Sequence, residues 1–296
     1  MRRALAAVAV AGAVGLGLGA CGLPEGIDGT ITNGWPALPE PVGLVPEPGT
    51  CHLDYLEVVT LTRYNPVPCT RPHAAETAHV GTFTGGAADR LRPPPFGSPE
   101  MREAYHECEG AAAEYLGADF RYGRLWLGVV LPSEPAWEGG ARWFRCDLAF
   151  LTVERDTTHT EGLRGALAEP SDLHLGCFTV TEAADGEVDE MEPVDCDEDH
   201  QAEFVGVWRA PDVPYLAAAD DDAAARVHRG CRGEVADFAD LPDDGNLIYR
   251  TGTVADWMDE LDWEAGDRGF RCYLYLPDRT LTRSLRGAGP DALPVQ

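Results

Sequence analysis

Hydrophobic residues recur at helical spacing in two stretches of the chain. The first stretch carries Met101, Tyr105, Cys108, Ala112, Tyr115 and Leu116. This spacing of three or four residues places the side chains on one buried face of a helix. Ser98 and Pro99 precede the stripe as an N-cap and a first helical residue. A second helix is expected over 220–235, where Ala224, Val227, Cys231 and Val235 form a similar stripe.

Shorter runs rich in β-branched, aromatic and alternating apolar residues predict strands. They cover 55–64, 77–83, 125–131 and 144–153 in the first half of the chain, and 204–208 and 270–276 in the second. A short helical turn is expected after Pro132, carrying Trp137. The pattern predicts an α+β fold in which each half holds a small, mainly antiparallel sheet and one principal helix.

The chain also repeats itself. The segment WEGGARWFRC over 137–146 returns as WEAGDRGFRC over 263–272, with seven of ten positions identical. Two further patterns recur in the same order, Cys-x3-His-x2-Glu from Cys69 and Cys196, and Leu-Arg-Gly-Ala from Leu163 and Leu285. The copies lie 122 to 127 residues apart, which is the length of a domain rather than of a solenoid repeat. We therefore expect two tandem domains, over 51–168 and 173–288.

The first twenty residues have the features of an export signal. Arg2 and Arg3 precede an apolar stretch that is short for a membrane-spanning helix. Leu18-Gly19-Ala20-Cys21 then reads as a lipobox, in which cleavage leaves Cys21 to carry thioether-linked and amide-linked acyl chains such as palmitate. An ordinary cleaved signal and an uncleaved anchor helix are the alternatives. Residues 21–50 are rich in Pro and Gly and are expected to form a tether.

Cysteine usage agrees with an exported protein. Besides Cys21, each half has four cysteines: Cys51, Cys69, Cys108 and Cys146, then Cys177, Cys196, Cys231 and Cys272. An even number in an oxidising compartment indicates disulfides. Equivalent pairing within each half leaves three schemes, of which we favour first-to-second and third-to-fourth. Zinc is the competing use of four cysteines, but the closely spaced ligand pairs of zinc sites are absent from the sequence.

The chain is strongly acidic. It has 50 acidic and 23 basic residues and a formal net charge of −27, with no lysine. Removal of residues 1–20 leaves 21 arginines and a net charge of −29. Such a charge disfavours nucleic acid and anionic lipid as direct partners. Serine nucleophile elbows, HExxH elements and phosphate-binding glycine loops are absent, and no cofactor or metal is expected.

Two residue sets are candidates for chemistry. His73 with Glu76, and His200 with Glu203, could ligate a metal or share a proton. Two ligands do not complete a tetrahedral site, however, so we favour a structural role in which each imidazole bonds the backbone beside a cystine.

The second set lies next to Trp137 and Trp263 and consists of Arg142 and Arg145 in the first half and Arg268 and Arg271 in the second. Arginine forms bidentate pairs with carboxylates and phosphates, so these residues could bind an envelope polymer. Internal pairing with Glu138 and Glu264, around tryptophans that anchor the core, is the interpretation we favour.

These motifs together resemble a known family. The lipobox, Gly176-Cys177-Phe178, the Cys-x3-His-x2-Glu and Trp…Gly-x-Arg…Cys elements and the late Leu-Arg-Gly are similar to those of septum formation-related domains of actinobacterial envelope proteins. The resemblance covers nearly all of the mature chain as two copies. It implies a link to the division septum and no established catalytic activity. The first copy departs at its opening, where His52 replaces the expected aromatic residue.

The sequence thus predicts a non-catalytic lipoprotein on the outer face of the cell membrane, with a binding or scaffold role linked to septum formation. Its expected partners are the membrane, through the lipid, and envelope or division proteins. Two alternatives stay open. One is an enzyme acting on an envelope polymer through the His/Glu pairs, and the other is a carrier of a small apolar ligand held between the two domains.

Acylation of Cys21 is the most direct prediction from the sequence. Mass spectrometry of the membrane fraction should find a mature chain that begins with a diacylated Cys21. The variant Cys21→Ala should leave the membrane fraction, because one missing lipid anchor removes the apolar contact with the bilayer. A mature chain that starts elsewhere and retains a free Cys21 thiol would contradict the prediction.

Overall fold

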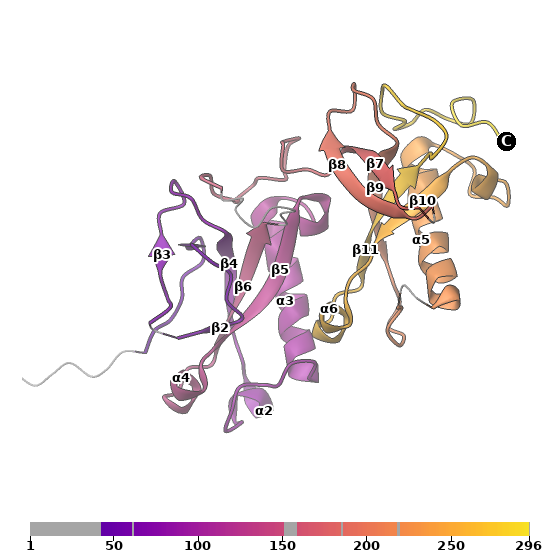
Figure 1. Ribbon diagram of the computed structural model, residues 1–296. Coiled ribbons are helices and arrows are strands. Elements are labelled where there is room, and N and C mark those ends of the chain that lie inside the picture. The colour runs from indigo at the N-terminus through magenta and orange to yellow at the C-terminus, as the bar shows by residue number, and fades with distance from the viewer. Residues whose placement is uncertain (1–42, 61, 151–158, 185, 218–219, 296) are drawn as a thin grey trace, which may run out of the picture. The chain divides into compact units, whose positions relative to one another are not determined.

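The computed structural model describes residues 43–60, 62–150, 159–184, 186–217 and 220–295. The predicted signal peptide, the acylated Cys21 and most of the tether therefore lie outside the described residues, as does the end of the strand expected over 144–153. Residues 43–296 form one compact unit. The described part of this unit has an α+β fold with two β-sheets (Figure 1).

The first sheet has the strand order β2-β5-β6-β4-β1-β3. Its strands are β1 (Cys51–His52), β2 (Val58–Val59), β3 (Pro66–Val67), β4 (Ala75–Thr82), β5 (Leu125–Pro132) and β6 (Trp143–Phe150). All pairs are antiparallel except β2 with β5. The accompanying helices are α2 (Gly85–Ala88), α3 (Pro99–Leu116), η1 (Phe120–Tyr122) and α4 (Glu134–Glu138).

The second sheet has the order β10-β11-β9-β7-β8 and is antiparallel throughout. Its strands are β7 (Cys177–Glu182), β8 (Val188–Val194), β9 (Ala202–Arg209), β10 (Gly252–Asp256) and β11 (Gly269–Tyr275). The helices of this half are α5 (Asp221–Ala239), η2 (Leu247–Tyr249) and α6 (Glu260–Ala265).

The two sheets follow one plan. The order β5-β6-β4-β1-β3 in the first is matched by β10-β11-β9-β7-β8 in the second. The register is also the same, because Cys51 lies opposite Glu76 and Cys177 lies opposite Glu203. The sequence repeat is therefore a repeat of strand order and register.

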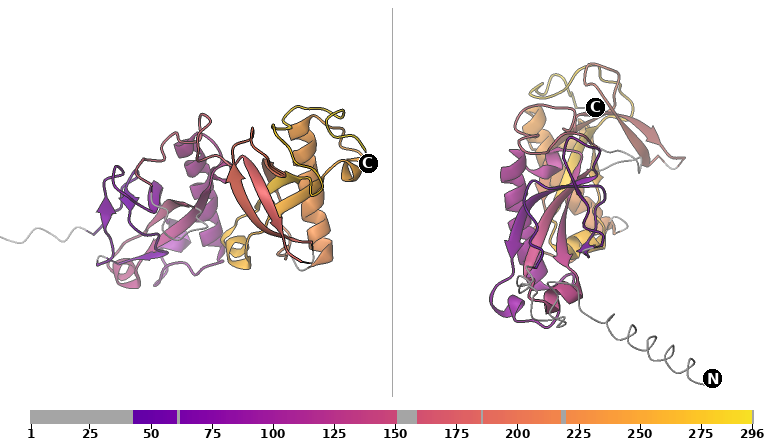
Figure 2. Two further views of the ribbon diagram at one scale, coloured as in Figure 1. Left: turned by 45° about the horizontal axis from the view of Figure 1, so that its top comes forward. Right: turned by 90° about the vertical axis from the view of Figure 1, so that its left-hand side faces the viewer.

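Both long helices begin where the sequence predicts. The Ser98 hydroxyl accepts a hydrogen bond from the Met101 amide at 3.3 Å, and Asp220 accepts one from Ala223 at 2.8 Å. Helix α3 ends at Gly117, whose φ of 88° lies in the left-handed region that glycine adopts without strain. Each helix runs along one face of its own sheet (Figure 2).

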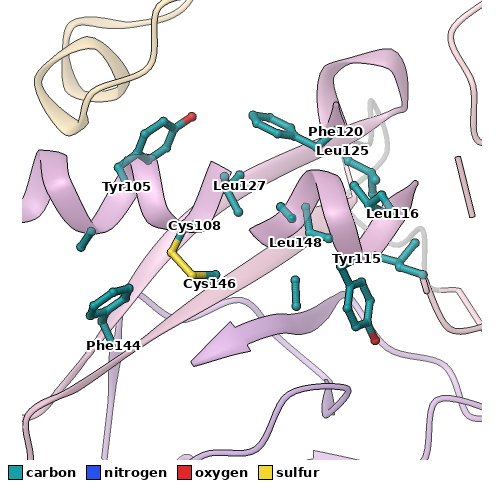
Figure 3. Close-up of a cluster of buried hydrophobic side chains, with 14 of the residues drawn as sticks. Tyr105, Cys108, Tyr115, Leu116, Phe120, Leu125, Leu127, Phe144, Cys146 and Leu148 are labelled. Carbon is teal, nitrogen blue, oxygen red and sulfur yellow. A yellow bond between two sulfur atoms is a disulfide. The ribbon is translucent and has the colours of Figure 1, made fainter. Parts of the chain in front are cut away.

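The buried stripe of α3 packs onto the sheet as expected. Tyr105, Cys108 and Leu116 meet side chains of β5 and β6 such as Leu127 and Leu148 (Figure 3). The second half has an equivalent core in which Val227, Cys231 and Val235 of α5 are buried. Apolar burial on one side of each sheet is the main stabilising contact of each half.

Disulfides join the elements in the scheme we favoured from the sequence. The described residues contain Cys51–Cys69, Cys108–Cys146, Cys177–Cys196 and Cys231–Cys272. Cys108–Cys146 fastens α3 to β6, and Cys231–Cys272 fastens α5 to β11. A bridge of this kind typically contributes about 2–4 kcal/mol, largely by restricting the unfolded chain.

The strand expected over 55–64 is wrong in extent. Of its described residues only Val58 and Val59 form a strand, paired with the end of β5. The alternation arises because Tyr55, Val59 and Tyr64 pack over the sheet beside Val130 and Trp143. Tyr55 and Tyr64 cover the sheet from loop positions, so the spacing of the three residues reflects burial rather than the pairing of one long strand. Strands β1, β3, β7, β8 and β10 were not predicted.

The folded region also extends beyond the predicted domain ends. The Trp143 indole donates to the Leu44 carbonyl at 2.9 Å, and the Thr77 amide donates to the Thr50 carbonyl at 2.9 Å. At the other end, Leu293 is buried and its carbonyl accepts from Arg250 at 2.6 Å. Residues 43–50 are therefore part of the fold rather than tether, and the second half continues past residue 288.

Two glycines of α5 provide a matched test of its packing. A Cβ at Gly230 would lie 2.2 Å from the Trp208 ring, whereas a Cβ at Gly233 would meet nothing within 4 Å. Gly233→Ala should raise the free energy of unfolding by about 0.5–1 kcal/mol through helix propensity. Gly230→Ala should lower it by roughly 1–3 kcal/mol through overpacking. Urea unfolding of the two variants measures both free-energy changes. Equal stabilisation by both substitutions would contradict the placement of α5 against Trp208.

Candidate functional site

The predicted His/Glu pairs are buried beside the disulfides. His73, Glu76, His200 and Glu203 are at most 2% exposed. Each glutamate lies on the strand next to the first cysteine of its half, which brings Cys51, Cys69 and Glu76 together, and likewise Cys177, His200 and Glu203. The sulfurs are engaged in disulfides, however, and a metal ligand must be a free thiolate. These groupings therefore do not supply the ligands of a metal centre.

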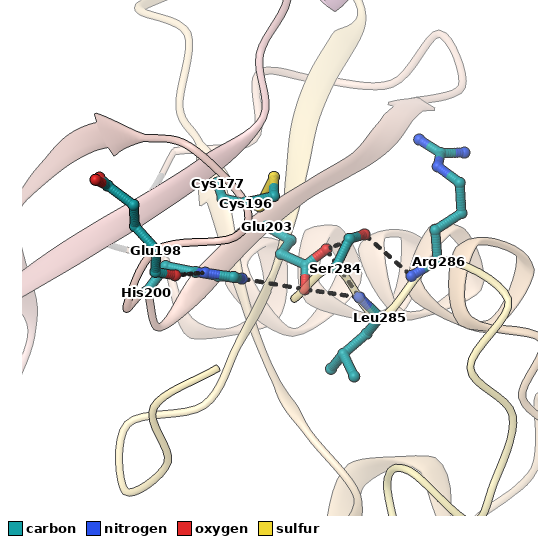
Figure 4. The surroundings of a disulfide bond; sticks show 8 residues. All are labelled: Cys177, Cys196, Glu198, His200, Glu203, Ser284, Leu285 and Arg286. Carbon is teal, nitrogen blue, oxygen red and sulfur yellow. Dashed lines mark hydrogen bonds and ion pairs between the residues drawn. A yellow bond between two sulfur atoms is a disulfide. The ribbon is translucent and has the colours of Figure 1, made fainter. Parts of the chain in front are cut away.

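The Glu203 carboxylate holds the chain segment that follows β11 (Figure 4). It accepts the Leu285 amide at 2.9 Å and the Ser284 hydroxyl at 2.7 Å. His200 Nε2 lies 3.4 Å from the same carboxylate. The other ring nitrogen, Nδ1, lies 2.7 Å from the Glu198 carbonyl oxygen. The oxygens of Glu203 are thus engaged by donors of its own chain.

Glu76 repeats this arrangement in the first half. Its carboxylate accepts the Leu163 amide at 2.7 Å and the Tyr115 hydroxyl from the end of α3. Burial and the hydrogen bond to Glu76 raise the pKa of Tyr115, which keeps the phenol protonated as a donor. His73 Nδ1 bonds the Arg71 carbonyl at 2.8 Å.

Two of the recurring motifs therefore form a single structural unit. The glutamate of Cys-x3-His-x2-Glu binds the backbone at the first residue of Leu-Arg-Gly-Ala in both halves. The arginine of the second motif then lies over an aromatic ring of the long helix, with Arg164 4.2 Å from the Tyr115 centroid and Arg286 4.5 Å from that of Phe238. The motif closes the core at the end of each helix.

The Trp/Arg candidates form a second internal unit. Trp137 is 1% exposed and Trp263 is 5% exposed. The guanidinium carbon of Arg142 lies 4.3 Å from the Trp137 ring centroid, and that of Arg268 lies 4.1 Å from the Trp263 ring. Neither tryptophan presents an open face on which a sugar ring could stack.

The same arginines bond the backbone. Arg142 Nη1 donates to the Trp137 carbonyl at 2.7 Å, and Arg268 Nη1 donates to the Trp263 carbonyl at 2.6 Å. The partners expected from the sequence, Glu138 and Glu264, do not form ion pairs with them among the described residues. The pairing is internal, but the acceptors are mainly carbonyl groups.

The second arginine of this motif has a different environment in each half. Arg145 is buried and forms an ion pair with buried Asp147. Arg271 instead donates to backbone carbonyls of the first half, those of Arg121 at 3.0 Å and Leu125 at 2.5 Å. One sequence position thus serves a polar network in one half and contact between the halves in the other.

Sequence reasoning missed the charged residues between the two halves. Buried Arg121 contacts Glu109, Asp119 and Asp267, and Arg209 reaches the first two of these carboxylates. Burial opposes the charge of Arg121, yet Asp267 and the other carboxylates raise its pKa overall. The repeat gave no signal for this network, because η2 has Ile248 at the place of Arg121 in η1.

The geometry defines a cystine-stapled α+β protein whose repeated motifs build its core. Residues 48–272 match the family described as Septum formation, and the chain belongs to that family. No curated protein and no solved structure was found to match it significantly. Among the described residues, the helices lack the combination of length and apolarity that crossing a membrane requires.

The role of Glu203 can be tested by conservative substitution. Glu203→Gln keeps the shape but replaces one acceptor oxygen with a donor that faces other donors. Leaving a buried hydrogen-bonding group unsatisfied costs about 1–3 kcal/mol, so urea unfolding should show a loss of that size. Ser284→Ala removes a single bond and should cost about 1 kcal/mol or less.

Exposed Glu190→Gln on β8 serves as the control and should leave stability nearly unchanged. If Glu203→Gln unfolds like the unaltered protein and loses a biological activity, the His/Glu pair is a functional site and the structural interpretation is wrong.

Proposed function

We propose that this protein is a non-catalytic lipoprotein of the cell envelope that acts as a binding or scaffold element in septum formation. The observation that carries the proposal is the family match over residues 48–272. The N-terminal sequence supports the localisation in this proposal. It has the features of an export signal followed by Cys21, whose acylation anchors the chain on the outer face of the membrane.

In this proposal the chain consists of two tandem domains. The common strand order and register of the two sheets support that division. The disulfides support it as well, because each described bridge closes within one half. A duplicated domain gives a membrane-anchored protein two related surfaces for partners in the envelope.

A non-catalytic role agrees with the chemistry of the candidate pairs. Glu76 and Glu203 accept backbone amides, and His73 and His200 are fully buried. A general acid or base must reach a substrate proton directly or through a water molecule. The carboxylates that could do so are instead engaged in holding the Leu-Arg-Gly-Ala segments.

The acidic surface favours partners of the opposite charge. A net charge of −29 in the chain without residues 1–20 gives a field that attracts basic protein segments and repels polyanions. We therefore infer that the partners are envelope or division proteins that present basic surfaces, with the lipid anchor confining the encounter to the membrane. Such binding should weaken as salt screens the charges.

Complementation of a deletion strain tests the proposal. Cells without the protein should show misplaced or delayed septa, and the unaltered gene should restore them. The Cys21→Ala variant should be exported as a folded, oxidised chain. Because it lacks the lipid anchor, it should leave the membrane and restore septa poorly. The variants His73→Ala and His200→Ala, tested after folding has been verified, should restore septa.

Normal septa in the deletion strain would contradict the septal role. A metal-dependent hydrolysis of an envelope polymer that both His substitutions abolish would instead identify an enzyme. A disulfide-resolved gel controls for folding in every variant.

A further inference from the structure

The first half contains a buried polar network where the second half is aromatic. On the face of β4 and β6 directed away from α3, His52 Nε2 lies 2.9 Å from the Thr77 hydroxyl, which donates to Asp147 at 2.8 Å. The Asp147 carboxylate also accepts from Arg145 Nη2 at 2.5 Å. His52, Thr77, Asp147 and Arg145 are all at most 5% exposed.

Strand register identifies the counterparts of these residues. Ala75 pairs with His52 as Ala202 pairs with Phe178, and Thr77 pairs with Asp147 as Phe204 pairs with Tyr273. Phe178, Phe204 and Tyr273 form an apolar cluster with edge-on ring contacts. The fold is therefore compatible with a fully apolar packing at this place, and the first half carries a polar one instead.

This replacement leaves donors without partners. Arg145 is 2% exposed, and its Nε and Nη1 have no hydrogen-bond partner among the described residues. A buried donor left unsatisfied is destabilising, and a guanidinium more so than a neutral group. The counterpart in the second half, Arg271, uses its donors on backbone carbonyls and Asp256.

Arg145 lies at a small cavity beneath the loop that follows β1. The polar residues around the cavity are His52, Asp54, Arg63, Tyr64, Asn65 and Arg145. Its volume is about 20 Å³. A single water needs roughly 10–15 Å³, whereas pockets that enclose a whole small molecule measure about 300–1,000 Å³. The space therefore suits one polar head group rather than an entire ligand.

Arg63 and Arg145 are the two cationic groups that line the cavity. Arg63 lies at the exposed rim and Arg145 at the base, while the Asp147 carboxylate already serves Thr77 and Arg145. Burial, followed by the charge of Arg145, lowers the pKa of His52 to about 3, so this imidazole is neutral at pH 7. Asp54 is exposed on the loop, so its negative charge faces solvent at the mouth of the cavity.

We propose that this cavity binds the carboxylate of a small acid or of a peptide, with Arg145 as the buried donor and Arg63 as the rim charge. Guanidinium and carboxylate form strong charge-assisted hydrogen bonds, and Arg145 Nε and Nη1 are the donors left without a partner among the described residues. The remainder of the ligand stays outside, against the described residues around the cavity mouth such as Leu53, Asp54 and Asn65. The second half has no equivalent function, because its counterpart face is closed by aromatic rings.

Titration of the mature chain tests this site. The chain from residue 21, with Cys21→Ser to avoid the lipid, is followed through the Arg145 Nε–H resonance in NMR spectra. Acetate should shift that resonance in a saturable way, and chloride at equal ionic strength should not. A shift that is the same in both salts, or absent, means that the cavity holds water only and overturns the proposal.

Surface substitutions keep the test independent of folding. Arg63→Gln should weaken acetate binding by about two- to fivefold, the range expected for one exposed charge. Arg92→Gln removes an equally exposed charge elsewhere and should leave binding unchanged. Equal affinity in the two variants would exclude Arg63 and the cavity as the binding site.

The source of the carboxylate is resolved by two further probes. An acetylated dipeptide with a free C-terminus should bind more tightly than acetate if the ligand is a peptide, and more tightly than its own C-terminal amide in either case. Equal affinity of the dipeptide and acetate identifies a small free acid. Both results support the proposal, whereas binding of the amide as tightly as the free acid would overturn it.

Discussion

The buried glutamate of each half is the contact on which the rest of that half depends. Glu76 and Glu203 lie on central strands, out of water, where an unpartnered carboxylate would cost several kcal/mol. Each is satisfied by the backbone amide of a leucine more than 80 residues further along the chain. That leucine is buried at the end of the long helix, so one carboxylate fixes the sheet, the helix end and the final segment together. The neighbouring disulfide then restrains the strand that pairs with the glutamate.

The features that could be predicted from the sequence are those that local pattern or duplication reveals. The stripe from Met101 to Leu116 has a helical period, and the cysteines recur in order, so the helix and the disulfide scheme could both be inferred. The strand over 55–64 could not, because Tyr55 and Val59 alternate for burial over a sheet to which most of the segment does not pair. Arg121 was beyond prediction for a different reason: it occurs in one half alone, and its partner Asp267 lies 146 residues away.

The two halves agree on the helix side of each sheet and differ on the other side. The glutamate, the disulfides and the Trp/Arg unit occupy the same register in both halves, because they pack against the long helix or close its ends. On the opposite face, His52, Thr77 and Asp147 stand where Phe178, Phe204 and Tyr273 stand in the second half. The repeated motifs align these positions in the sequence, because Thr77 and Phe204 follow the motif glutamates and Asp147 and Tyr273 follow the motif cysteines. Only the strand register shows that the three positions share one face of the sheet.

The order of the disulfides has a consequence for the oxidation of the chain. Every described bridge joins a cysteine to the next one along the chain, over separations of 18, 38, 19 and 41 residues, and the four loops do not interleave. A polypeptide that emerges from a translocation channel N-terminus first therefore presents its cysteines in the order in which they are to be joined. Oxidation in order of emergence yields the native set directly. Pairing in this order lets the first half complete its covalent closure before the cysteines of the second half are needed.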